Sequence, residues 1–223
     1  MALYSISAIL AELLAQERPL IRLLCIHPEN PQARLVKQVV EILKQGGVAI
    51  LPTDSGYSLC CPLGEKEPLE RIRRIRNLED KHFFTVLCRD LAEAAVYGHI
   101  NNPAFRFLKA HIPAPLTFIL SATKEVPKRL LHPRRKTVGI RIPQSPSMMA
   151  ILHAFSAPLM SVSVDEFEKT WPLLDPEEIF SKYHKQIDIM VSVGTMTATH
   201  TTVIDLINGI PTVIRQGSYS LNG

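Results

Sequence analysis

Residues 48–62 read VAILPTDSGYSLCCP, and this stretch decides the fold of the chain. The run 48–52 is apolar and short, which is typical of a buried strand. The Asp and Gly residues within 53–57 then supply the chemistry of a tight turn. A further strand is expected over 58–62. Two strands joined by a turn indicate that a β-sheet lies at the centre of the domain.

Helical patterns lie on both sides of this stretch. Residues 31–45 have apolar side chains at helical spacing, Pro31 suits the first turn, and Gly46-Gly47 closes the helix with a left-handed cap. Asp175 stands where a helix N-cap is expected. Other helices are expected at 3–16, 66–76, 90–97, 102–110 and 146–155, and other strands at 22–26, 83–88, 116–121, 137–142, 159–164, 187–193, 202–206 and 211–215. This alternation predicts an α/β domain with a mixed sheet flanked by helices.

The composition predicts a protein of the cytoplasm. The chain has 223 residues, of which 46% are hydrophobic, so a sizeable core is expected. No apolar run is long enough to span a membrane, and residues 1–16 lack a basic start and carry Glu12, unlike a signal peptide. Hence no membrane partner is expected. The cysteines form no pair of CxxC motifs, and we expect four reduced thiols, mostly buried in strands: Cys25, Cys60, Cys61 and Cys88.

Positive charge is concentrated in two segments. The formal net charge is only +4, but residues 124–141 contain seven basic side chains and one acid, Glu125. A second cluster of arginines lies within 71–76. Clusters of this kind suit a polyanion such as nucleic acid, but they also occur as solvated faces of ordinary proteins. Charge alone leaves both interpretations open.

Several well-known site motifs do not occur in the sequence. It has no GxGxxG or GxxxxGK[ST] loop, so phosphate groups would have to be bound by side chains and turns. It has no GxSxG elbow of a serine hydrolase. Its eight histidines show no HxH or HExxH spacing, so a dedicated metal site is not expected.

Polar residues recur at the ends of the expected strands. Arg141 lies in a strand of apolar neighbours, where an unpaired charge would be costly. Two arginines and several hydroxyls at strand ends would make a small anion pocket. Alternatively, Arg141 pairs with a structural aspartate, for which Asp54 and Asp205 are candidates, and the hydroxyls satisfy nearby backbone groups. The other polar residues of this set are Ser161, Ser163, Thr201 and Arg215.

Three segments, 27–32, 71–91 and 123–131, resemble the YciO branch of the YrdC/YciO family, and six short blocks together resemble the family as a whole. In chain order they are PTDSGY (52–57), PAPLTFIL (113–120), TVGIRIP (137–143), SVS (161–163), TTVIDL (201–206) and VIRQG (213–217). The resemblance covers about 27–217. It implies a single domain over 25–217 with the twisted, mixed sheet of the YrdC/RibB-like fold and a large positively charged cavity. An N-terminal helical extension (1–24) and a C-terminal tail (218–223) would flank it.

The resemblance also implies a function. Members of the family join threonine, bicarbonate and ATP into threonylcarbamoyl-AMP, with release of pyrophosphate, for threonylcarbamoyladenosine modification of tRNA. We therefore expect a protein that binds ATP or an AMP-like ligand, with Mg²⁺ accompanying ATP, and that binds RNA. Two readings stay open: an L-threonylcarbamoyladenylate synthase, which is a nucleotidyltransferase, and a non-catalytic module that binds double-stranded RNA.

Site residues follow from the resemblance position by position. The family's KxR motif, which meets the ATP phosphates, corresponds to Arg74-Ile75-Arg76, and no residue is identified as a catalytic acid or base. Nucleotide-binding residues would be Arg74, Arg76, Thr137, Ser163 and Arg215. Threonine-binding residues would be Ser55, Arg141, Ser161 and Thr201. The residues expected to bind RNA are Lys128, Arg129, Arg134, Arg135 and Lys136.

The sequence departs from the family pattern at three places. The asparagine of the SxN motif is replaced, because the motif reads Ser163-Val164-Asp165. An aspartate there would repel a triphosphate unless a metal ion lay between them. A histidine usual near the end of the next strand after KxR is Leu87 or Cys88 here, and PGP has become PAP at 113–115. These changes leave an anion site in place and the synthase activity open.

Overall fold

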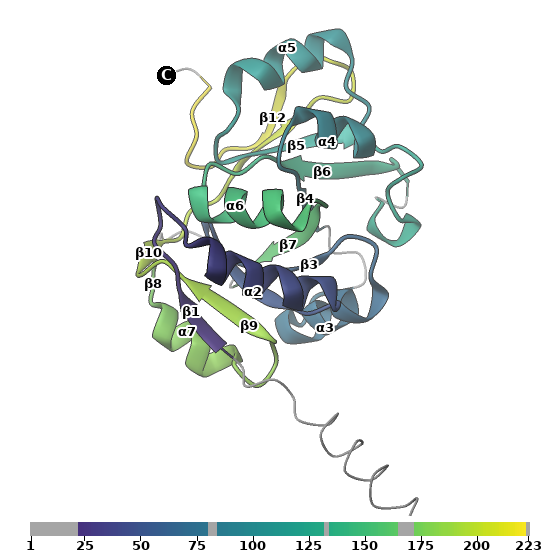
Figure 1. The fold of residues 1–223 in the computed structure, drawn as a ribbon. Helices are drawn as coiled ribbons and strands as arrows, with labels where there is room; N and C mark the ends of the chain where they lie inside the picture. The colour runs from purple at the N-terminus through teal and green to yellow at the C-terminus, as the bar shows by residue number, and fades with distance from the viewer. Residues whose placement is uncertain (1–21, 80–83, 132–133, 165–171, 222–223) are drawn as a thin grey trace, which may run out of the picture.

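A large mixed β-sheet with helices on both faces forms the protein (Figure 1). The computed structural model describes residues 22–79, 84–131, 134–164 and 172–221, so the helix expected at 3–16 and Asp165 lie outside the described residues. The sheet strands are β1 (Arg22–Cys25), β2 (Ala49–Thr53), β3 (Gly56–Pro62), β4 (Thr85–Leu87), β5 (Leu116–Ser121), β6 (Thr137–Arg141), β7 (Leu159–Ser163), β9 (Ile189–Ser192), β11 (Thr202–Asp205) and β12 (Thr212–Arg215). The helices are α2 (Ala33–Lys44), α3 (Lys66–Arg76), α4 (Leu91–Tyr97), α5 (Asn102–His111), η1 (Lys128–Leu130), α6 (Pro146–Phe155) and α7 (Pro176–Tyr183).

The order of the strands is β1-β9-β2-β3-β7-β4-β6-β5-β11-β12. The sheet contains parallel pairs, such as β1–β9 and β4–β6, and antiparallel pairs, such as β2–β3 and β5–β6, which confirms the expected mixed sheet. Two short strands that the sequence did not predict, β8 (Leu173–Leu174) and β10 (Met196–Thr197), pair separately. Within the described part of the chain, no helix has the length and apolar character needed to cross a membrane.

The hairpin formed by β2 and β3 is tighter than the sequence predicts. Thr53 pairs directly with Gly56, so only Asp54 and Ser55 form the turn. The Thr53 hydroxyl donates to the Gly56 carbonyl oxygen at 2.8 Å and accepts from the Ser55 N–H at 3.2 Å. Gly56 has a φ of 109°, a conformation that L side chains rarely adopt. These bonds fix the two turn residues at one end of the hairpin.

Residues of β3 alternate between the two faces of the sheet, as strand geometry requires. Tyr57, Leu59 and Cys61 face one core cluster, which α3, α4, α5 and α7 also line. Cys60 faces a second cluster, to which α2 and α6 contribute. Figure 1 shows these two helices side by side on that face. Below, this second side is called the α2/α6 face.

Local signals explain where the helices begin and end. Asp175 caps α7 as predicted, since its side chain accepts from Glu177 N at 2.8 Å, and Asp90 caps α4 by accepting from Glu93 N at 2.7 Å. The helix expected at 31–45 begins later, with Gln32 as N-cap, so Pro31 precedes the helix instead of lying in its first turn. All four cysteines are free thiols, and three are buried: Cys60, Cys61 and Cys88.

Candidate functional site

A row of small and polar residues crosses the α2/α6 face of the sheet. Cys60 pairs with Ser161, Ser161 with Thr85, and Thr85 with Gly139. Residues directly opposite one another in neighbouring strands point to the same face. Because side chains alternate along a strand, Arg141 shares this face with Gly139. The sheet therefore presents hydroxyls and one guanidinium beside the apolar surface that α2 and α6 cover.

Arg141 forms a buried ion pair with Asp54. The Arg141 Nη2 donates to Asp54 Oδ1, Nη1 donates to the Ser55 hydroxyl at 2.9 Å, and the two charged side chains are 6% and 8% exposed. Burial lowers the pKa of the Arg141 guanidinium, and the Asp54 carboxylate opposes that shift. Of the two candidate partners, the structure selects Asp54, since Asp205 Oδ1 instead accepts from the Ile207 N–H at 2.8 Å.

Three buried polar atoms lie around this pair without a hydrogen-bond partner among the described residues. They are Asp54 Oδ2, Arg141 Nε and Thr199 Oγ1. Thr199 is held next to the hairpin turn, because its N–H donates to the Ser55 carbonyl oxygen at 3.1 Å. Buried polar atoms are nearly always paired in native proteins, so each exception calls for an explanation. Unpaired hydrogen-bond donors and acceptors beside a buried ion pair make this place a candidate ligand-binding site.

A second polar group joins Arg215 to the ends of β5 and β11. The Arg215 Nη2 donates to the carbonyl oxygen of Thr201 at 3.0 Å and to its hydroxyl at 3.2 Å. The Thr201 hydroxyl lies 2.8 Å from the hydroxyl of Thr117. Arg215 and Thr201 were expected to bind different parts of a ligand, and the structure brings them into direct contact.

The arginines of α3 do not act as one basic face. Arg76 Nε donates to the carbonyl oxygen of Ser163 at 2.8 Å, which brings together two of the expected nucleotide-binding residues. Arg74 is exposed, and its Nε donates to the Glu70 carbonyl oxygen at 3.4 Å within the helix.

The remaining two arginines of this cluster have structural partners. Arg71 pairs with Asp188 at 2.7 Å. Arg73 lies over the Phe84 ring and donates to the Glu79 carbonyl oxygen at 2.6 Å. All four arginines of the predicted cluster therefore have hydrogen-bond or ion-pair partners within the fold.

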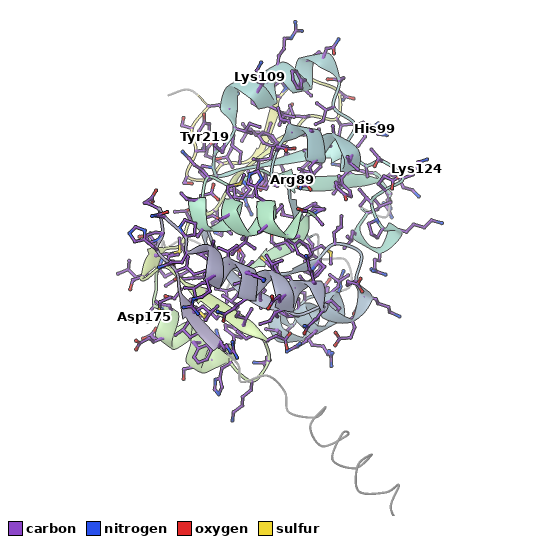
Figure 2. All side chains as sticks on the ribbon, viewed as in Figure 1. Arg89, His99, Lys109, Lys124, Asp175 and Tyr219 are labelled. Atoms are coloured by element: carbon purple, nitrogen blue, oxygen red, sulfur yellow. The ribbon has the colours of Figure 1, made fainter. Side chains whose placement is uncertain are left out.

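The remaining site residues predicted from the sequence lie in two parts of the structure, the α2/α6 face and the connection between β5 and β6. Thr137 begins β6 and is buried on the α2/α6 face, two residues before Gly139. The Ser161 hydroxyl donates to the Thr85 carbonyl oxygen at 3.3 Å. The residues expected to bind RNA lie between β5 and β6, in the same connection as Lys124, which Figure 2 labels at the edge of the molecule. All five are exposed: Lys128, Arg129, Arg134, Arg135 and Lys136.

Sequence reasoning missed three hydroxyl residues of this face or its rim: Thr85, Thr117 and Thr199. The first two are polar residues within apolar strand patterns, a signal that could have found them, whereas Thr199 lies outside any strand. Leu87, at one of the departures from the family pattern, is fully buried and pairs directly with Arg141. An apolar side chain therefore fills the space next to the ion pair.

The chain is similar to known proteins in both sequence and fold. A family model for Sua5, YciO and YrdC proteins, described as "Telomere recombination", matches residues 41–217. A protein of Escherichia coli (strain K12) named "Uncharacterized protein YciO" is 47% identical over 196 residues, covering 86% of this chain and 93% of its own length. The crystal structure of E. coli YciO superimposes with a TM-score of 0.84, at 45% identity, over 90% of this chain and 98% of that chain.

More distant relatives have named activities or ligands. A protein of Bos taurus named threonylcarbamoyl-AMP synthase is 29% identical over 150 residues, covering 62% of this chain and 54% of that protein. A structure of P. abyssi Sua5 complexed with L-threonine has a TM-score of 0.80 at 18% identity, over 90% of this chain and 59% of that chain, and shows a shared fold. The family match and the YciO relative establish that the chain belongs to the Sua5/YciO/YrdC family.

Proposed function

We propose that the polar row on the α2/α6 face binds threonine together with a nucleotide, and that the protein forms threonylcarbamoyl-AMP from threonine, bicarbonate and ATP. The observation that carries this proposal is the buried Arg141–Asp54 pair, with Ser55 in contact and unpaired polar atoms beside it. Relatives support it, since one is named threonylcarbamoyl-AMP synthase and another, P. abyssi Sua5, was solved with L-threonine.

The nucleotide would lie between two arginines, Arg76 at the end of α3 and Arg215 at the end of β12. Arg76 donates a hydrogen bond to the carbonyl oxygen of Ser163, the last residue of β7. Arg215 donates one to the carbonyl oxygen of Thr201, which directly precedes β11. Guanidinium groups bind phosphate oxygens in a planar, two-pronged geometry. In the described residues no three His, Cys, Asp or Glu side chains gather into a metal site. Mg²⁺ would therefore arrive with the phosphates of ATP.

Catalysis at such a site would come mainly from positioning and from charge stabilisation. Holding the threonine amine, bicarbonate and the α-phosphate in contact replaces an unfavourable encounter of three molecules. Arginine groups near the phosphates stabilise the negative charge that develops as pyrophosphate leaves. In this proposal, Arg76, Arg141 and Arg215 supply these two effects.

Calorimetric titration of ATP with Mg²⁺, with and without threonine and bicarbonate, tests the proposal together with a pyrophosphate-release assay. We expect threonine to strengthen ATP binding and pyrophosphate to be released. Arg141→Ala should abolish the threonine effect, whereas Arg71→Ala, which removes an arginine paired with Asp188, should retain it. A threonine response that survives Arg141→Ala would refute the assigned role of Arg141.

A second candidate function rests on the exposed basic connection between β5 and β6. Its exposed basic side chains suit the phosphate backbone of RNA. We propose that this segment binds RNA, and that neutralising Arg134, Arg135 and Lys136 together weakens binding and reduces its dependence on salt concentration. Filter binding at several salt concentrations measures both quantities. An unchanged salt dependence would mean that the segment is an ordinary solvated surface.

A further inference from the structure

We infer that Thr202 is a positioning residue for Arg215: its hydroxyl holds the C-terminal segment 216–219 in place, and this segment keeps the Arg215 guanidinium at the ligand site. The inference rests on the proposed function, in which Arg215 binds the nucleotide, and deepens it by assigning what orients that arginine. Thr202 is fully buried at the start of β11, where its backbone pairs with β5. It therefore acts through Arg215 and not by contact with a ligand.

The strand that carries Arg215 has little packing to fix the side chain. β12 is the last strand of the sheet, so it has a neighbouring strand on one side alone, and all four of its residues are exposed. Arg215 Nη2 donates to the carbonyl oxygen and the hydroxyl of Thr201, and these are the only partners of its side chain among the described residues. Its Nε and Nη1 stay available for a phosphate. Because arginine has many rotamers, holding it in one position needs further contacts.

A β-bulge directs Arg215 to the ligand side of the sheet. The pairing of β11 with β12 shifts next to Val203, which leaves Ile214 as an extra residue in β12. Val203 pairs with Arg215 in β12 and with Thr117 in β5, so the Arg215 side chain shares a face with the Thr117 hydroxyl. In a regular ladder Arg215 would pair with Thr202 and point to the opposite face. The bulge therefore needs to be kept in place.

The segment that follows the bulge is held by the Thr202 hydroxyl. This hydroxyl donates to the carbonyl oxygen of Tyr219 at 2.6 Å and accepts from the Gly217 N–H at 2.9 Å. The side-chain amide of Gln216 donates to the same Tyr219 carbonyl oxygen at 2.7 Å. Residues 216–219 therefore fold back onto the start of β11, and one buried hydroxyl links both ends of this short segment.

Gly217 allows this segment to approach the acceptor of Arg215 closely. A Cβ atom at position 217 would collide with the carbonyl oxygen of His200 and would lie 2.6 Å from that of Thr201. Both obstacles are backbone atoms, so a side chain there would push the segment away. The Thr201 carbonyl oxygen is the one to which Arg215 donates. Displacement of the segment would therefore disturb the contact that orients the arginine.

Calorimetric titration of ATP with Mg²⁺ tests the inference on variants of the full chain. Thr202→Val removes the hydroxyl and should weaken ATP binding by roughly tenfold, but by no more than Arg215→Ala does. Thr202→Ser keeps the hydroxyl and should bind ATP like the wild type. The matched control Thr212→Val removes an exposed hydroxyl of β12, which donates to the Ile210 carbonyl oxygen at 3.4 Å, and should also keep the wild-type affinity.

A double variant separates positioning from a general loss of structure. In Thr202→Val/Arg215→Ala the arginine is already absent, so ATP should bind no more weakly than to Arg215→Ala alone. Losses that add in the double variant would overturn the inference, and so would weak ATP binding by Thr202→Ser. If circular dichroism shows that Thr202→Val does not fold, Gly217→Ala, which changes a residue after the last strand, takes its place with the same expected outcomes.

The outcomes distinguish the inference from the proposed function. Weak ATP binding by Arg215→Ala together with wild-type affinity in Thr202→Val would overturn the inference and leave the nucleotide site standing. Absence of ATP binding by the wild-type chain would overturn both.

Discussion

Removing the Asp54 carboxylate should destabilise the folded protein, because Arg141 would then be buried without its counter-ion. The two side chains are only 8% and 6% exposed. Truncating one partner of a buried ion pair costs about 3–5 kcal/mol, whereas exposed pairs contribute about 0–1 kcal/mol. We therefore expect Asp54→Ala to lower the free energy of unfolding by about 3–5 kcal/mol. Asp188→Ala should cost less, since the Arg71–Asp188 pair is 25% and 29% exposed.

Two further variants distinguish the cost of an unpaired buried charge from the cost of lost packing: one that truncates Arg141 instead of Asp54, and the double variant. Arg141→Met leaves Asp54 as the unpaired buried charge and should cost a similar amount of stability. In the double variant Asp54→Ala/Arg141→Met no buried charge is unpaired. Its cost should therefore be smaller than the sum of the two single costs, with a coupling energy of about 0.5–3 kcal/mol.

Urea unfolding followed by circular dichroism at neutral pH measures these differences. With a slope of roughly 2–3 kcal/mol per M, a loss of about 3–5 kcal/mol moves the unfolding midpoint by about 1–2.5 M. The reasoning is refuted if Asp54→Ala shifts the midpoint no more than Asp188→Ala does. It is also refuted if the costs of the two single variants simply add in the double variant.

Two further predictions concern buried side chains. Tyr57→Phe should cost about 1–3 kcal/mol in urea unfolding, because the hydroxyl donates to the Gly194 carbonyl oxygen at 2.6 Å and accepts from the Val193 N–H at 3.1 Å. Burial raises the pKa of Tyr57, so wild-type stability should fall above pH ~10, where only the unfolded chain loses this proton, and the Phe variant should lack that component. A thiol reagent should label Cys25 quickly in the folded protein, and fast labelling of a second thiol would contradict the structure. The reagent should label the other three cysteines, Cys60, Cys61 and Cys88, only in the presence of denaturant, because burial raises the pKa of their thiols.

The sequence predicts the long elements of this fold well and the short ones poorly. Helix α2 has a strong apolar period and a glycine after its end, so its position was predicted to within two residues at each end. Strands β8 and β10 have two residues each, too few for any period to appear. Their pairing depends on contacts between distant segments, and no local pattern records such contacts.

The candidate site could be predicted in part. Arg141 is conspicuous as a charge within an apolar strand, and the structure shows the pairing with an aspartate that the sequence left open as the alternative to an anion pocket. The choice between Asp54 and Asp205 was beyond the sequence, because it depends on how the β2–β3 turn reaches β6. In the sheet order, β7 and β4 lie between the β2–β3 hairpin, whose turn carries Asp54, and β6, which carries Arg141. Only the three-dimensional path of the hairpin shows that its turn contacts the far strand.

The path of the β2–β3 hairpin also explains why hydroxyl residues near position 200 lie at this site. Thr199 donates its N–H to the carbonyl oxygen of Ser55, on the turn that holds Arg141. Two residues later, the Thr201 hydroxyl lies 2.8 Å from Thr117 on β5, and Arg215 donates to Thr201. One short segment thus connects the ion pair at the hairpin turn with the arginine expected to bind a nucleotide. A ligand that contacts Asp54 and Arg141 at one end and Arg215 at the other would follow this segment, which supports a joint site for an amino acid and a nucleotide.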